Sequence, residues 1–169
     1  MAWFIIAAAI VLLAGFAIFF GAPYVPSQRK YVRRAFDQLY KVTAKDVLID
    51  VGSGDGLVLR LAAQRGATAI GYEINPGLVV ISRLLSLRYK KVSIQLANFW
   101  RVELPSATTV VYIFGVSRDG KRFIRKLQAE ATRLGHPLTL ICYGSPLADL
   151  KPEKTFEAYH LYTFDPLQS

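Results

Sequence analysis

Short apolar runs alternate with amphipathic stretches from about residue 42 onward. The short runs are rich in Val, Ile and Tyr, which predicts buried strands. The stretches between them repeat apolar residues at helical spacing, which predicts helices that cover a sheet. The predicted strands are 46–50, 67–72, 92–96, 108–114 and 137–143, and the predicted helices are 57–65, 76–87 and 119–134. Such alternation is typical of an α/β fold with a mostly parallel, doubly wound sheet.

The chain begins with an apolar segment, residues 3–22 (WFIIAAAIVLLAGFAIFFGA), that contains no charge. A helix of this length spans roughly 30 Å, the hydrocarbon thickness of a bilayer. We therefore expect a single-pass membrane anchor. The alternatives are a cleaved signal peptide, which has a basic start and a shorter apolar stretch, and a buried helix. Basic residues follow from Arg29 onward, so the positive-inside rule predicts a domain on the cytoplasmic side, or on the matrix side in a mitochondrion.

Two more segments flank the alternating pattern. Ser27 is placed to N-cap a short basic helix that runs to about Lys41. The tail 155–164 (TFEAYHLYTF) alternates and predicts a final strand at the sheet edge. The expected organisation is therefore an anchor at 1–22, a linker and basic helix at 23–41, and an α/β domain at 42–169.

The net charge of the chain is +9, and the apolar segment contributes none of it. A basic domain attracts anionic lipid, nucleic acid or acidic proteins. Beside a bilayer we favour anionic lipid headgroups over nucleic acid. A single cysteine, Cys142, and two histidines, His136 and His160, give no metal-ligand spacing, so no metal site is predicted. We expect Cys142 to be a buried strand residue and not a nucleophile.

A glycine-rich turn carries the first candidate site. It consists of Asp50, Gly52, Ser53, Gly54, Asp55 and Gly56, directly after the first strand of the α/β pattern. Alternate glycines let the backbone turn sharply and approach a ligand, and the following helix offers free N–H groups. The spacing differs from the dinucleotide fingerprint and resembles the S-adenosylmethionine site of class I methyltransferases. An acidic neighbour suits that cationic ligand. The alternative is an ordinary glycine turn.

Two further strand ends add candidate cofactor contacts. Glu73 ends the second strand, where a carboxylate can accept the hydroxyls of a ribose. The alternative for Glu73 is a carboxylate that caps the next helix. Asn98 follows the third strand and has both a donor and an acceptor for an adenine, which Phe99 or Trp100 could cover. The alternative is a turn asparagine beside core aromatic rings.

The fourth strand ends where an acceptor would approach the cofactor. Candidates to line the acceptor channel are Tyr24, Tyr112, Phe114 and Tyr143, with core packing as the alternative role of each. We identify no general base. The catalytic residues therefore remain unassigned, and a lysine acceptor would have to arrive neutral.

Together the motifs resemble the mitochondrial lysine methyltransferases that modify the ATP synthase c-subunit and the adenine nucleotide translocase, with their prokaryotic relatives. The resemblance covers about residues 21–126 and rests on GAPYVPS, GSGDG, GYEINP and IFGV in that order. It implies a Rossmann-like class I methyltransferase fold, S-adenosylmethionine as cofactor and a lysine-bearing membrane protein as substrate. By position it implies that Asp50 and the loop glycines hold the methionine part, Glu73 the ribose and Asn98 the adenine side.

The sequence also departs from this family. Asn98 stands where the family usually has Asp, and residues 142–146 read CYGSP where it is usually rich in Arg, Phe and Pro. Basic residues follow IFGV where methionines are usual, and they form a stripe: Arg118, Arg122, Arg125 and Lys126. Alternatives therefore stay open, namely an RNA or small-molecule methyltransferase, or a non-catalytic S-adenosylmethionine-binding module on a membrane.

Overall fold

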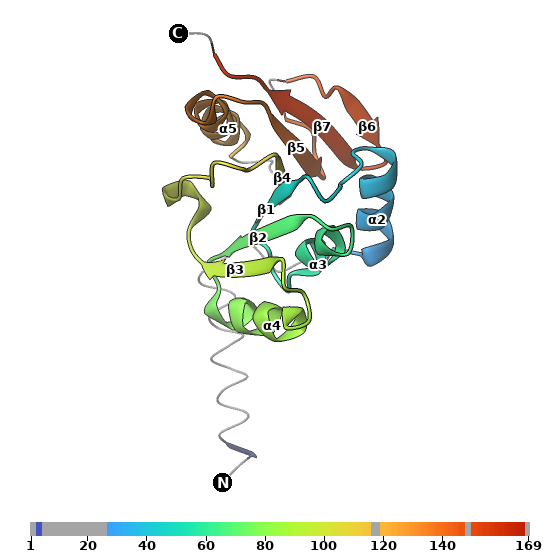
Figure 1. The fold of residues 1–169 in the computed structure, drawn as a ribbon, viewed down its shortest axis with the longest axis vertical. Helices are drawn as coiled ribbons and strands as arrows, with labels where there is room; N and C mark the ends of the chain where they lie inside the picture. Colours follow the sequence, from blue (N-terminus) through green and yellow to red (C-terminus); the bar gives the residue numbers. More distant parts are fainter. Residues whose placement is uncertain (1–2, 5–26, 116–118, 148–149, 168–169) are drawn as a thin grey trace.

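The structure, a computed structural model, describes residues 3–4, 27–115, 119–147 and 150–167. Its strands form a single sheet in the order β3-β2-β1-β4-β5-β7-β6 (Figure 1). The strands are β1 (Val47–Val51), β2 (Thr68–Glu73), β3 (Val92–Leu96), β4 (Val110–Phe114), β5 (Leu138–Tyr143), β6 (Lys154–Phe156) and β7 (Tyr159–Phe164). The strands from β3 to β5 pair in parallel, so the predicted mostly parallel α/β sheet is confirmed.

Helices cover both faces of the sheet. The first core cluster joins α2 (Arg29–Gln38), α3 (Leu57–Ala63) and α4 (Pro76–Ser86) to one face. The second cluster joins α5 (Gly120–Leu134) and the short 3-10 helix η1 (Phe99–Arg101) to the other. Figure 1 shows α2 and α3 on one side of the sheet and α5 on the opposite side. This two-sided cover explains why the central strands are apolar on consecutive residues.

The tail differs from the sequence-based expectation of one edge strand. It forms an antiparallel hairpin in which β7 pairs with both β5 and β6, so β6 is the edge strand. The turn lies at Glu157, which adopts a left-handed φ of 54°. Nothing in the local sequence marks this turn, because Glu157 and Ala158 are not typical turn residues and the apolar alternation continues across them.

The basic helix begins later than predicted. Gln28, not Ser27, occupies the N-cap position of α2, and no side chain caps that helix. Ser27 instead lies near Tyr112 in β4, where its side chain partly offsets the rise in the pKa of Tyr112. Helix α2 buries Val32 and Phe36 in the same core as α3, so it packs as part of the α/β domain.

The predicted anchor, residues 3–22, lies outside the described residues except for residues 3–4. None of the helices in the described part of the chain is long and apolar enough to cross a bilayer.

Candidate functional site

The order of the strands reverses between β1 and β4. Ligands of open α/β sheets bind at such a switch point, outside the carboxyl ends of the strands. Three segments follow β1, β2 and β3 at this edge: residues 52–56, which we call the glycine loop, residues 74–75, and residues 97–104, which we call the β3–β4 loop. The carboxyl edge therefore collects every segment that carries a predicted cofactor contact.

The backbone of the glycine loop is left-handed at alternate positions. Gly52, Gly54 and Gly56 have φ values of 71°, 53° and 78°, a region that favours glycine. The N–H groups of Gly52 and Ser53 donate to the carbonyl of Tyr72, at 2.9 and 3.2 Å, which ties the loop to β2. A Cβ atom at Gly52 would have nothing within 4 Å. The loop is therefore fixed to β2 by hydrogen bonds, and the space next to Gly52 is open.

Small residues allow the glycine loop to lie directly on the domain. A Cβ atom at Gly71 would lie 2.5 Å from Ser53 Oγ, and one at Gly56 would lie 2.3 Å from Ser82 Oγ. The buried hydroxyl of Ser53 has no hydrogen-bond partner among the described residues. Ser53 therefore packs its side chain inward against β2, and the feature that the loop offers to a polar ligand is the close approach of its backbone.

Glu73 connects the glycine loop to the start of α4. Its Oε2 accepts from the Gly54 N–H at 2.9 Å, and its Oε1 accepts from the N–H groups of Ile74 and Asn75 at 2.8 and 2.9 Å. A carboxylate has about four acceptor positions, so one remains for a ligand hydroxyl. The side chain of Glu73 therefore fixes the loop and the turn into α4, the alternative role given for it, and leaves an acceptor position for one ligand hydroxyl instead of the two predicted.

Asp50 is a buried carboxyl group beside two other acidic side chains. It lies opposite Gly71 and Tyr112 on the neighbouring strands and is 3% exposed. Burial raises the pKa of Asp50 well above its usual value, and the charges of Glu73 and Asp55 raise it further. A cation bound here would favour the ionised form of this carboxyl group.

Asp55 is committed mainly to the start of α3. Its Oδ1 accepts from the Leu57 N–H at 2.9 Å, and its Oδ2 lies 3.4 Å from the guanidinium of Arg60. The Arg60 side chain is buried beneath the loop and also donates to the Asp55 carbonyl. Asp55 thus stiffens the glycine loop and contributes negative charge near Asp50.

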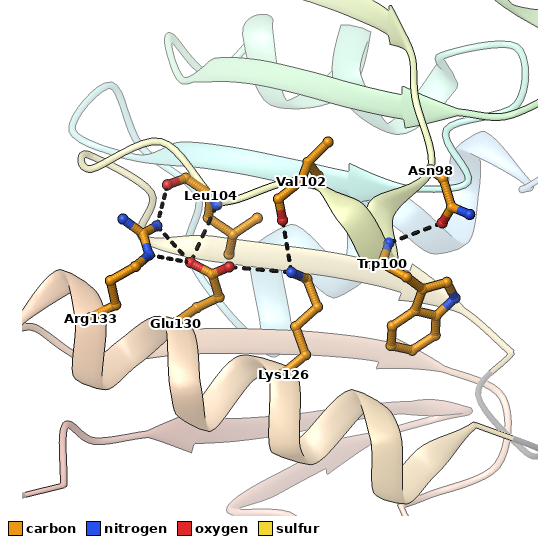
Figure 2. Close-up of polar contacts among 7 residues, drawn as sticks. All are labelled: Asn98, Trp100, Val102, Leu104, Lys126, Glu130 and Arg133. Carbon is orange, nitrogen blue, oxygen red and sulfur yellow. Dashed lines mark hydrogen bonds and ion pairs between the residues drawn. The ribbon is translucent and has the colours of Figure 1, made fainter.

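The β3–β4 loop carries the two residues predicted for the adenine side. Asn98 is exposed, and its Oδ1 accepts from the Trp100 N–H at 3.0 Å, which caps η1 (Figure 2). Phe99 is 4% exposed, and its ring stacks on Phe123 at 5.3 Å between centroids. The structure therefore leaves the amide of Asn98 at the surface and places the Phe99 ring in the core, the packing role that the sequence also allowed.

An ion cluster on α5, centred on the buried side chain of Glu130, holds the β3–β4 loop in place. Glu130 accepts from the Leu104 N–H at 3.3 Å and pairs with Lys126 and Arg133 at 3.2 and 2.6 Å. Lys126 also donates to the Val102 carbonyl at 2.7 Å, and Arg133 donates to that of Leu104 (Figure 2). Sequence analysis missed this cluster because Glu130 follows Leu104 by 26 positions.

Two cations of the predicted basic stripe face this loop. Lys126 belongs to the ion cluster, and Arg122 lies over the Trp100 ring at 4.2 Å from its centroid. Arg125 is exposed, and Arg118 lies outside the described residues. Two of the four cations of the stripe therefore make contacts with other residues of the same domain.

Aromatic rings occupy the other side of the switch point. Phe114 stacks on Tyr143, and Tyr143 contacts Tyr159 edge-on, each pair at 4.7 Å between centroids. The hydroxyl of buried Tyr112 lies 3.5 Å from that of Tyr159. We call Tyr112, Phe114, Tyr143 and Tyr159 the aromatic cluster. Of the predicted channel residues it contains three, while Tyr24 lies outside the described residues. Tyr159 was missed because the tail was expected to be a single edge strand.

Three buried groups on this side, Tyr112, Tyr159 and Cys142, remain protonated at neutral pH. Burial raises the pKa of Tyr159 to about 12 and that of Tyr112 well above its usual value. Burial also raises the pKa of the Cys142 thiol to about 11. All three side chains are buried, and none of them is poised as a base or a thiolate nucleophile.

Comparison with known proteins places this arrangement among methyltransferases. Residues 50–154 match the family described as the ANTKMT methyltransferase domain. The lysine N-methyltransferase of the ATP synthase c-subunit from Xenopus laevis is 35% identical over 111 residues, which cover 64% of this chain and 48% of the relative. The human protein of the same name is 34% identical over 111 residues, with 46% of the relative covered. The chain thus spans about half the length of these curated relatives.

Two other similar proteins are matched over more of their length. A protein-lysine N-methyltransferase of Saccharolobus islandicus is 33% identical over 114 residues, with 64% of this chain and 69% of the relative covered. The crystal structure of an RNA methyltransferase from Salinibacter ruber, in complex with S-adenosyl-L-homocysteine, matches with a TM-score of 0.72 and 25% identity. That match covers 86% of this chain and 96% of the other.

Proposed function

Because the chain belongs to the ANTKMT methyltransferase domain family, we propose that it is an S-adenosylmethionine-dependent methyltransferase that modifies lysine in a membrane protein. The matched residues, 50–154, include the glycine loop, Glu73 and the β3–β4 loop. The observation that carries the proposal is the left-handed glycine loop, open at Gly52 and bonded to the carboxylate of Glu73. The animal and archaeal relatives named above as lysine methyltransferases support the choice of acceptor.

The cofactor would lie along the carboxyl ends of β1 to β3. The open side of the glycine loop at Gly52 would hold its methionine part, and Asp50 would face its cationic groups. Glu73 would accept one ribose hydroxyl, and the exposed amide of Asn98 would meet the adenine side. When bound, S-adenosylmethionine would supply its methyl carbon to an in-line nucleophile, and S-adenosylhomocysteine would leave with the electron pair of the broken C–S bond. The protein's part is mainly to align the two and to exclude water.

The acceptor would enter beside the aromatic cluster. Phe114 is 36% exposed and, with Tyr143, offers an apolar wall next to Gly115 at the end of β4. An apolar, positively charged surrounding lowers the pKa of a lysine, which favours its neutral, nucleophilic form. We assign no general base, because a neutral amine needs none to attack.

For the location of the protein, we propose a single-pass anchor within residues 3–22 and a domain on the cytoplasmic or matrix side. The uncharged run and the basic residues that follow it support this placement. The full chain should remain in the membrane pellet after a carbonate wash. Release into the supernatant would refute the anchor without touching the catalytic proposal.

The catalytic test uses the full chain, radiolabelled S-adenosylmethionine and membranes of the source cell. Gly52→Leu fills the open side of the glycine loop, whereas Gly135→Leu is a matched control. Gly135 has a φ of 75°, also has nothing within 4 Å of its Cβ position, and ends α5 away from the site. Both variants therefore carry the same backbone strain of about 1–2 kcal/mol. Only Gly52→Leu should abolish labelling.

The identity of the labelled molecule decides between acceptors. Label on lysine of a small hydrophobic protein supports the proposal. Label on RNA would favour the second candidate, RNA methylation, which the likeness to the Salinibacter ruber enzyme supports. Cofactor binding without any label would favour a non-catalytic binding module, and the absence of binding would remove the methyltransferase assignment.

A further inference from the structure

Helix α4 exposes most of its large apolar side chains and buries two serines beside Val79. Ser82 and Ser86 face the domain and are buried, and neither hydroxyl has a hydrogen-bond partner among the described residues. Large apolar side chains face outward: Val80, Ile81, Leu84 and Leu85 are each between 48% and 62% exposed. Amphipathic helices of soluble domains place such side chains in the core instead.

The apolar surface extends beyond the helix at both ends. Leu87, directly after α4, is 78% exposed. At the other end, Ile74 and Leu96 are 49% and 57% exposed, and they follow or end β2 and β3 at the carboxyl edge. We call these residues, Ile74, Val80, Ile81, Leu84, Leu85, Leu87 and Leu96, the α4 face. Contiguous exposed apolar surface of this kind marks an interaction site.

The charge around the α4 face has one sign. Between residues 74 and 102 the sequence contains no Asp or Glu, and it contains Arg83, Arg88, Lys90, Lys91 and Arg101. No described carboxylate forms an ion pair with any of these five cations. Arg83 and Lys91 donate instead to backbone carbonyls, of Ile94 and Gly66, which leaves their charge uncompensated.

We propose that the α4 face docks in the interfacial layer of an anionic lipid bilayer. An apolar helix face with a basic margin suits this environment, because the side chains enter the acyl boundary while the cations meet lipid phosphates. A second copy of the chain fits less well, since symmetric packing would bring two basic margins together. Helix α4 begins next to Glu73, so docking would place the carboxyl edge at the bilayer surface. The inference does not depend on the catalytic proposal.

The test measures contact between lipid and single positions of the full chain. Leu84→Cys carries a fluorophore on the α4 face, and Ala129→Cys carries the same fluorophore at an exposed position of α5, on the opposite face of the sheet. The native Cys142 is buried and its pKa is raised to about 11, so it should not react at neutral pH. The protein is reconstituted into phosphatidylcholine vesicles with or without phosphatidylglycerol, and the acyl chains carry a nitroxide quencher.

Quenching at Leu84→Cys that requires phosphatidylglycerol, with none at Ala129→Cys, supports the proposal. Replacing Arg88, Lys90 and Lys91 together with Gln should lower the docking equilibrium roughly 10- to 100-fold. The proposal is overturned if the Leu84→Cys fluorophore stays unquenched in anionic vesicles. It is also overturned if quenching is equal at both positions. If the labelled protein stays unquenched, and unlabelled Leu84→Cys protein forms a disulfide-linked dimer when treated with a mild oxidant such as copper phenanthroline, the occupant is a second copy.

Discussion

On the β1–β3 side of the carboxyl edge, polar groups are held by backbone hydrogen bonds, whereas on the β4–β7 side aromatic rings are held by one another. Glu73 accepts three backbone N–H groups, and the Tyr72 carbonyl accepts two more from the glycine loop. Within the aromatic cluster, the Tyr112 and Tyr159 hydroxyls lie 3.5 Å apart, and the other described contacts between its members are ring packing. Backbone hydrogen bonds fix atoms closely, while ring packing tolerates substitution more readily. We therefore expect a substitution on the first side to cause a large loss of cofactor affinity and stability. A substitution on the second side should cause a smaller loss, in turnover.

The largest effect is expected from Glu73→Gln. The amide keeps the shape of the carboxylate but turns a donor toward N–H groups, so the glycine loop loses its support. Cofactor affinity in calorimetry should fall about 10- to 100-fold, and the free energy of unfolding should fall by about 1–3 kcal/mol. The exposed Glu153→Gln is the matched control and should change stability by less than about 0.5 kcal/mol. Unchanged affinity in Glu73→Gln would contradict the role of this carboxylate.

A smaller effect is expected on the aromatic side from Tyr143→Ala. This change removes the ring that contacts both Phe114 and Tyr159. Turnover of the methyl acceptor should fall about tenfold, because alignment is lost, while cofactor affinity stays within about twofold. The same change at Tyr89, which lies away from the cluster and bonds Gln64, should alter neither quantity. Loss of cofactor affinity in Tyr143→Ala would show that the two sides are not separable.

The smallest effect concerns pH and Asp50. Its pKa is raised in the free protein, chiefly by burial, so at low pH the carboxyl group is neutral. A cationic cofactor favours the ionised form, and binding therefore releases a proton. Affinity should rise with pH up to the raised pKa, by at most about tenfold per pH unit for one proton. Calorimetry in buffers of different ionisation enthalpy would count that proton, and a count that is unchanged in Asp50→Asn would contradict the assignment.

The same carboxyl group affects stability in the opposite direction. The pKa of Asp50 is higher in the folded protein than in the unfolded chain. At pH values between these two pKa values, the folded state therefore binds more protons than the unfolded state. The contribution of Asp50 to the free energy of unfolding is fully present below pH 3.8, the ordinary pKa of this carboxyl group. It is lost as pH rises through the pKa of the folded protein. Thermal unfolding of Asp50→Asn should therefore depend less on pH than that of the unmodified protein, with a gain in stability at neutral pH.

The two sides also differ in how far the sequence predicts them. The glycine loop and Glu73 are local patterns at the ends of predicted strands, so their convergence follows from the parallel sheet alone. Tyr159 reaches the site only because the tail folds back at Glu157, and the alternating pattern hides that turn. The ion cluster at Glu130 joins segments 26 positions apart, which no local spacing indicates.

Helix α4 shows a different limit of sequence analysis. Its apolar content and Pro76 predict a helix, and the structure has one over Pro76–Ser86. The sequence alone does not tell which face is buried, because two buried serines stand where leucines would be expected. The close approach of Gly56 explains one of them. A Cβ atom added at Gly56 would lie 2.3 Å from Ser82 Oγ, so position 82 has no space for a side chain larger than serine.

The position of β7 between β5 and β6 has a consequence for biosynthesis. A ribosome releases the five parallel strands before it releases the hairpin. In the nascent chain β5 is therefore an edge strand whose backbone groups facing the future β7 are unpaired. An exposed edge strand of this kind is a template for pairing with other chains. Until the hairpin arrives, the newly made protein would need a chaperone or rapid completion to avoid aggregation.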